Sequence, residues 1–214
     1  VGIFGEGAAL SAPEVVKDAN GRAFVGLPQT AGDPMELQDD ATGMTLRVWA
    51  RQADPKSSLR VADGLAIYSG AAPGGGNIVY RVTPTAAEDY VELLEKGSSA
   101  KLDYLVDVSQ VAGLRLVENV LEFLDDHGSP RLRVAHPYIV GQDGVRQEAK
   151  LSVQGCRYDT SLVAPWDRDV TAPGASTCTV SVTWDDSTVE YPAMVDPPWT
   201  SAASMAGARQ YHSL

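Results

Sequence analysis

Turn-forming residues recur at short intervals along this chain, and their spacing constrains the fold more than any other feature. Gly and Asn adopt the positive φ angles that tight turns require. Between these turns lie short segments of the length that strands have. The turn signals are Asn20-Gly21, Thr42-Gly43, Asp63-Gly64, Gly74-Gly75-Gly76, His127-Gly128-Ser129-Pro130, Asp143-Gly144 and Pro173-Gly174.

Several segments between the turns alternate apolar and polar residues with a period of two, which is the pattern of a half-buried strand. Many short strands at this spacing predict an all-β fold. We expect an antiparallel β-sandwich or a β-meander stack, built as one unit or as two small β subdomains. The apolar positions are Met44, Leu46, Val48 and Ala50, then Ala149, Leu151 and Val153, then Cys178, Val180, Val182 and Trp184.

The stretch from 113 to 134 predicts a meander. Residues 113–117 and 120–124 flank Glu118-Asn119, so they can pair as a hairpin. A second turn at 125–130 then leads into a strand at 131–134. Local hairpins of this kind need no long crossover connection.

Residues 84–96 fit two structures. Thr83 suits a helix N-cap, Pro84 the first helical position and Gly97 the C-terminal stop. The alternative is a strand at 78–83, a turn, and a second strand at 89–94. Local capping rules favour the helix.

Composition excludes several classes of function. The 214 residues include 28 Asp and Glu against 17 Lys and Arg, for a net charge of −11. This charge argues against binding to nucleic acid or to an anionic membrane surface. No apolar run approaches the roughly 18 residues of a membrane-spanning helix, so we expect neither nucleic acid nor membrane insertion.

Cys156 and Cys178 are the two cysteines of the chain. An isolated pair in a secreted protein indicates a disulfide, and closing a loop of this length would add roughly 3 kcal/mol of stability. The alternative is a pair of buried free thiols in a cytosolic protein. A bulge at Gly155 would bring Cys156 to the inward side of its strand. No signal peptide is visible, so the chain is cytosolic or its leader lies outside this sequence.

Catalytic signatures are missing from the sequence. It has no nucleophile elbow, P-loop, dinucleotide fingerprint or zinc-protease motif. His127, His136 and His212 are dispersed, without an orienting partner nearby in sequence. We therefore expect no catalytic residue and no cofactor.

Acidic clusters provide oxygen atoms that calcium could use, but none has the spacing of an EF-hand. Each cluster sits at a turn, where Asp side chains commonly cap the backbone. We therefore interpret them as turn caps and expect no metal site. The clusters are Asp39-Asp40, Asp125-Asp126, Asp185-Asp186 and the group Asp159, Asp167 and Asp169.

Seven short motifs follow one another in a shared order along the chain: 79–84, 88–93, 113–116, 120–123, 128–138, 143–144 and Tyr191-Pro192-Ala193-Met194-Val195-Asp196-Pro197. Together they resemble a β-rich module of large bacterial surface and secreted proteins, which precedes Rhs/YD, SBBP or kelch-like repeats. The resemblance covers about residues 65–198, whereas residues 1–64 match no family. It implies a non-enzymatic structural role beside a repeat region, and favours strands over a helix at 84–96.

Residues 199–214 resemble the opening of a kelch-like repeat of the kind found in myxobacterial proteins. The matching positions are Trp199, Met205, Arg209 and His212. A single repeat cannot bury its own hydrophobic face. The resemblance therefore predicts three segments: an N-terminal β segment at 1–64, the β-rich module at 65–198, and the start of a repeat or a tail at 199–214.

The segment Tyr158–Pro173 is long for a hairpin loop and mixes aromatic, charged and proline residues between the two cysteines. Tethered loops often carry binding functions. We expect its binding residues to be Trp166, Asp167, Arg168 and Asp169.

The hypothesis is a secreted or cell-surface binding and structural module that supports a downstream repeat region or contacts another surface protein. The alternatives are a hydrolase with a site assembled from dispersed Asp and His residues, and a calcium-stabilised module for glycan or protein.

Overall fold

Burial alternates along the strands of the computed structural model, which describes residues 23–202. In the strand at Ala86–Leu93, every second side chain is buried. Met44, Leu46 and Val48 are buried, as are Ala149, Leu151 and Val153. The period-two pattern therefore forms strands as predicted, and the all-β fold is confirmed as two antiparallel sheets.

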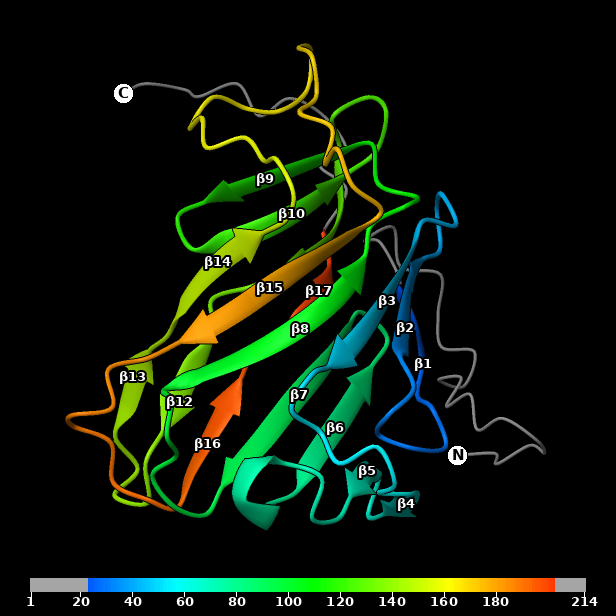
Figure 1. Ribbon diagram of the computed structural model, residues 1–214. Helices are drawn as coiled ribbons and strands as arrows, with labels where there is room; N and C mark the ends of the chain where they lie inside the picture. Colours follow the sequence, from blue (N-terminus) through cyan, green and yellow to red (C-terminus); the bar gives the residue numbers. More distant parts are fainter. Residues whose placement is uncertain (1–22, 203–214) are drawn as a thin grey trace, which may run out of the picture.

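Strands far apart in the sequence form each sheet (Figure 1). The six-stranded sheet has the order β1 (Ala23–Gly26), β2 (Met35–Asp39), β3 (Thr45–Ala50), β8 (Lys101–Asp107), β15 (Thr177–Thr183) and β14 (Lys150–Gln154). The eleven-stranded sheet has the order β13 (Arg146–Glu148), β12 (Tyr138–Val140), β16 (Ala193–Asp196), β7 (Ala86–Leu93), β17 (Trp199–Ser201), β11 (Pro130–Val134), β10 (Val120–Leu124) and β9 (Gly113–Val117). β4 (Leu59–Ala62), β5 (Leu65–Tyr68) and β6 (Ile78–Thr83) extend it from the other edge of β7.

Residues 84–96 form no helix. Pro84 and Thr85 make the turn between β6 and β7, and the two strands pair from Ile78 opposite Val91 to Thr83 opposite Ala86. The expectation from local capping rules is wrong, because a strand here buries Ala87, Val91 and Leu93 on one face of the larger sheet. Tertiary burial outweighs the weak helical preference of the segment.

The predicted meander is confirmed by the hairpin of β9 and β10, which continues into β11. Glu118 and Asn119 take φ values of 49° and 61°, as a two-residue hairpin turn requires. Gly155 has a φ of 83°, but it follows the last residue of β14 and so redirects the chain after the strand.

β16 and β17 pair with the same edge of β7 in one continuous register. Val195 lies opposite Val91, and Trp199 lies opposite Ala87. Pro197 and Pro198 interrupt the strand between them, because proline has no backbone N–H to donate to the ladder.

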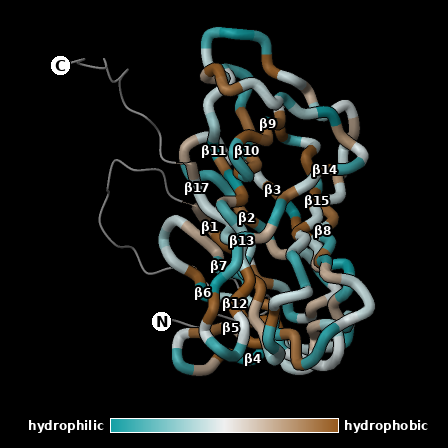
Figure 2. The backbone as a smooth tube through the Cα atoms, turned by 90° about the vertical axis from the view of Figure 1, so that its left-hand side faces the viewer, coloured by the Kyte–Doolittle hydropathy of each residue, from teal (hydrophilic) through white to brown (hydrophobic). Residues whose placement is uncertain are grey.

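The chain crosses between the two sheets without a loop at Ala149. β13 pairs with β12 in the larger sheet, and β14 pairs with β15 in the smaller one. Ala149 lies between these strands, is fully buried and donates its N–H to the Pro137 carbonyl at 2.9 Å. Figure 2 shows the two layers edge-on, with hydrophobic stretches between them.

One hydrophobic core joins the sheets, and its large side chains include Tyr104 of β8 and Trp199 of β17, whose ring centroids are 5.7 Å apart. Position 64 lies in the turn between β4 and β5, and strands from both sides of it share this core. Trp199 belongs to β17, whereas Met205, Arg209 and His212 of the repeat motif lie outside the described residues. Within residues 23–202, no helix is long and apolar enough to cross a membrane.

Candidate functional site

The loop between β14 and β15 is closed at its base by the predicted disulfide. Cys156 and Cys178 are bonded, with their Cα atoms 5.5 Å apart. Arg157 N donates to the Pro173 carbonyl at 2.8 Å just inside the bridge, so the two legs of the loop stay together. We call residues 158–173 the contact loop; it projects at the top of Figure 1.

Both legs of the contact loop dock on β9, the edge strand of the larger sheet. Asp159 N donates to the Leu114 carbonyl at 2.9 Å, and Leu116 N donates to the Asp159 carbonyl at 2.8 Å. Leu114 N in turn donates to the Thr171 carbonyl at 3.1 Å. A loop that starts and ends in the smaller sheet therefore covers the edge of the larger one.

Arg168 organises the contact loop from inside. Its guanidinium forms an ion pair with Asp159 and donates to the Val163 carbonyl at 3.2 Å and the Ala164 carbonyl at 2.8 Å. A planar fork of donors can hold a carboxylate and two carbonyls at once, which an ammonium group does less well. Arg168 thus connects the backbone at 163–164 to Asp159 at the start of the loop.

Arg115 of β9 supplies a second brace. It donates to the Ser161 carbonyl at 3.2 Å and pairs with Glu122 of β10 at 2.5 Å. Burial raises the pKa of Asp159, but the Ser161 N–H and the Arg168 guanidinium lower it further, so the net pKa falls. The carboxylate at the centre of the brace therefore stays ionised.

Two glycines allow the contact loop to lie close to the sandwich. A Cβ atom on Gly128, in the turn between β10 and β11, would lie 2.3 Å from the Pro165 carbonyl oxygen. A Cβ atom on Gly113 of β9 would lie 2.9 Å from Cβ of Val170. Gly128 also has a φ of 74°, so this position favours glycine on both counts.

The tip of the contact loop exposes three large apolar side chains within five residues. Leu162 is 75% exposed, Val163 66% and Trp166 41%. Of the four predicted binding residues, Trp166, Asp167 and Asp169 are exposed, whereas Arg168 is half-buried and engaged in the brace. Sequence reasoning missed Leu162 and Val163, although a Leu-Val pair beside Pro165 in a polar loop is a detectable signal.

An open hollow of about 440 Å³ lies beside the turn between β10 and β11. Asp125, Asp126 and His127 bring ligand atoms within 4.8 Å of one another there. Asp125 is nevertheless already engaged: it accepts from the N–H groups of His127 and Ser129 at 2.9 Å and from Arg131 at 2.7 Å.

Burial raises the pKa of Asp125, but these three donors lower it by more. Asp39 and Asp185 likewise accept hydrogen bonds from Thr42 and Ser187 in their own turns. The interpretation of these three acidic residues as turn caps is confirmed, and the Arg131 cation beside Asp125 opposes a metal ion.

The histidines in the described part of the chain lie on the surface. His127 contacts Asp126 at 2.7 Å, with both side chains more than four-fifths exposed. His136 lies 3.9 Å from Glu148. Within residues 23–202, neither histidine is buried beside a carboxylate that could orient it.

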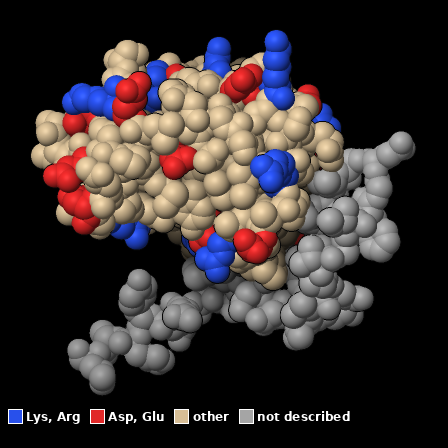
Figure 3. All heavy atoms as spheres, turned by 90° about the horizontal axis from the view of Figure 1, so that it is seen from below, with Lys and Arg blue, Asp and Glu red and all other residues tan. Residues whose placement is uncertain are grey.

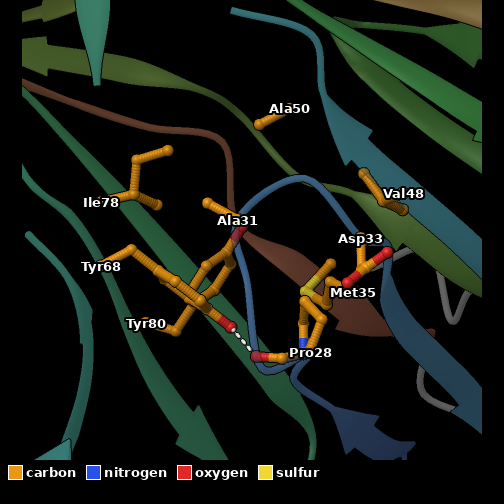
Figure 4. Close-up of a pocket in the computed structure, with 9 residues that line it drawn as sticks. All are labelled: Pro28, Ala31, Asp33, Met35, Val48, Ala50, Tyr68, Ile78 and Tyr80. Carbon is orange, nitrogen blue, oxygen red and sulfur yellow. Dashed lines mark hydrogen bonds between the residues drawn. The ribbon is translucent and has the colours of Figure 1, made fainter. Parts of the chain in front are cut away.

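The cavity in Figure 4 lies between the sheets, near the end of β5 and the start of β6. It is lined by Met35, Val48, Tyr68 and Tyr80 among others, and Tyr68 donates to the Pro28 carbonyl at 2.6 Å. It has room for about one water molecule, so it cannot hold a substrate.

No protein-family model matches the chain, and no curated protein matches its sequence. The candidate site is therefore defined by its own geometry: an apolar tip on a loop held by a disulfide, two arginines and two glycine contacts.

Proposed function

We propose that this chain is a non-enzymatic binding and structural module, and that the contact loop is its binding surface. The observation that carries the proposal is the brace around Arg168. A surface loop ordinarily needs no internal ion pair, disulfide and edge-strand docking together. So many constraints on one loop are typical of a scaffold that presents a fixed surface to a partner.

A secreted or cell-surface location fits this role. Disulfides persist in oxidising compartments and are rare in the cytosol. The bond between Cys156 and Cys178 closes the base of the contact loop, so reduction would loosen the part of the molecule that the proposal needs most.

The proposed partner is a repeat region of the same gene product or another surface protein. The resemblance of residues 65–198 to modules that precede repeats supports this placement. The contact loop already covers the β9 edge of its own sheet, and a module of this kind can also protect the exposed edge of an adjacent propeller.

No specific observation favours the two alternatives. A hydrolase would need an Asp–His pair held in an enclosed site, whereas the Asp126 and His127 side chains that contact each other are both more than four-fifths exposed. A calcium-stabilised module would need free carboxylate oxygens, whereas those of Asp125 and Asp159 are held by arginines and backbone N–H groups.

Deletion of residues 23–202 from the intact gene product tests the proposal. We expect the remaining protein to lose its association with the cell surface or to become several-fold more sensitive to protease. An intact protein that keeps its assembly, protease resistance and location without these residues would refute the role. Activity profiling of the intact protein tests the hydrolase alternative, because hydrolytic activity would support it.

A further inference from the structure

We propose that the contact loop inserts Leu162, Val163 and Trp166 into an apolar pocket, bordered by basic side chains, on a protein partner. This inference rests on the proposed function and names the chemistry of the partner. It also changes which residues make the contact: Arg168, predicted to bind, holds the loop in shape from within.

The exposed apolar side chains are concentrated at this tip. Eight large apolar residues are exposed in the described part of the chain, and three of them fall between positions 162 and 166. The other five are spread over β1, β4, the end of β7, the turn between β12 and β13, and β16. Single exposed apolar residues are ordinary, whereas a contiguous group marks an interaction site.

The loop is held in one shape before any partner arrives. Asp159, Arg168 and Arg115 fix the backbone on both sides of the tip, and Gly128 seats Pro165 against the sandwich. A loop ordered in advance loses little conformational entropy on binding, so more of the burial energy appears as affinity. Trp is also enriched among the residues that contribute most to binding at protein interfaces.

The charged side chains around the tip indicate which residues should border the pocket on the partner. Asp167 and Asp169 are exposed beside Trp166, and Asp126 is exposed on the turn that carries Gly128. Arg168 is neutralised by Asp159, and the chain as a whole carries a net charge of −11. Basic groups around the partner pocket would complement this acidic rim and speed association.

The same charges disfavour a membrane as the occupant. A Leu, Val and Trp tip could enter a bilayer, but anionic lipids would repel Asp167, Asp169 and the net negative charge. The opposite end of the molecule, shown in Figure 3, has Lys, Arg, Asp and Glu side chains interspersed with uncharged surface. Neither end presents the basic surface that an anionic membrane attracts.

Photo-crosslinking in the producing cell tests the inference directly. The intact gene product carries a photoreactive phenylalanine analogue at position 162 or 166, or at the control position Val61. Val61 is exposed on β4, at the other end of the molecule in Figure 1. We expect protein adducts from 162 and 166 but none from 61, with a yield that falls as salt concentration rises.

A triple variant measures the apolar contribution. Leu162→Ser, Val163→Ser and Trp166→Ser together should lower the yield of the same adduct, crosslinked from position 164, at least tenfold. The matched control combines Val61→Ser, Val145→Ser and Met194→Ser, which are also exposed and apolar, and should leave the yield unchanged. Circular dichroism and the melting temperature confirm that both variants fold.

Each remaining outcome overturns the inference. Adducts only with lipid, or binding to vesicles of phosphatidylserine and phosphatidylcholine, would assign the tip to a membrane. Equal adducts from 61 and 162, or no loss in the triple variant, would remove the loop tip as the contact. If deletion of residues 23–202 nevertheless disrupts the intact protein, only the loop assignment fails and the module role stands.

Discussion

At the scale of single residues, Asp89 is the most unusual group in the sandwich. Its side chain points from β7 into the core and is buried, with Tyr80 directly opposite on β6. Oδ1 of Asp89 has no hydrogen-bond partner among the described residues, whereas the nearby Tyr104 hydroxyl favours the ionised carboxylate. Burial raises the pKa of Asp89 to about 7; Tyr104 opposes this rise and the nearby Asp196 adds to it.

The proton on Asp89 should therefore control stability. The folded protein binds it up to about pH 7, whereas the unfolded chain releases it near pH 3.8. The folded state thus holds more protons between these values, and its free energy of unfolding falls as pH rises through this window. A shift of this size corresponds to up to about 4 kcal/mol. Urea denaturation between pH 4 and pH 8 measures the decline.

Asp89→Asn is the matched variant, because it keeps the shape of the side chain and cannot ionise. It should match the wild-type protein near pH 4 and be more stable at pH 8. Asp196 on β16 has its pKa raised to about 6, first by burial and then by Glu88, so the variant should keep a smaller slope. Identical pH profiles for the two proteins would show that Asp89 is not the proton-binding group.

At the scale of elements, Asn119 protects the free edge of β14. Its amide oxygen accepts from Leu151 N at 2.8 Å, and its amide nitrogen donates to the Ala149 carbonyl at 2.8 Å. These are the two backbone groups that an added strand would use. One side chain in the turn between β9 and β10 therefore closes this part of the edge, as exposed edge strands require.

Asn119→Ala should lower the free energy of unfolding by about 2 kcal/mol. Part of the loss comes from the side-chain hydrogen bonds to Leu151, Ala149 and Glu148, and part from placing alanine at a φ of 61°. Chemical denaturation measures the total. Asn119→Gly keeps the backbone conformation without the amide, so hydrogen exchange at Leu151 should be accelerated in both variants. Protection of Leu151 in the glycine variant would contradict the edge role.

The disulfide also acts at the scale of elements, because it joins Cys178 of β15 to Cys156, two residues after the end of β14. Replacing both Cys156 and Cys178 with serine should lower stability by about 3 kcal/mol, because the unfolded chain regains the freedom of a 22-residue loop. Reduction of the wild-type protein should give the same loss. Cleavage within residues 158–173 by protease should also become faster, while an unchanged rate would show that Arg168 alone fixes the contact loop.

At the scale of the whole molecule, the two sheets depend on one another. β3 and β8 lie in one sheet and β5 to β7 in the other, yet their buried residues form a single cluster. Chain segments before and after position 64 contribute to both layers. Neither sheet can bury its apolar face alone, so removal of one exposes the core of the other.

Unfolding should accordingly be a single cooperative transition. The calorimetric and van't Hoff enthalpies should agree, and the amides of Leu46 on β3 and Leu121 on β10 should exchange with the same free energy. Two separate transitions would instead support independent units on either side of residue 64, as the boundary expected from the sequence implies.

The alternation of apolar and polar residues, the turn residues and the cysteine pair predicted several of the strands, the hairpin at Glu118 and Asn119, the disulfide and the presence of a long loop between the cysteines. They failed at 84–96, where capping residues favour a helix that the sheet overrides. They also did not predict the contacts of Arg168, because its partners Asp159 and the carbonyls of Val163 and Ala164 depend on how the loop folds back. Local sequence patterns predict which face of a strand is buried, but they do not predict which distant residues a charged side chain will pair with.

By itself, the sequence determined that this chain forms antiparallel strands with a tethered, mixed-composition loop, because alternation and turn residues act over a few positions. Only the tertiary structure decided which strands pair, where the chain crosses between sheets at Ala149, and that Leu162 and Val163 stay outside. Those outcomes depend on contacts between segments that lie far apart in the sequence, such as Thr200 opposite Ala86. The free energy of burying a shared core selects them, and no local pattern encodes that core.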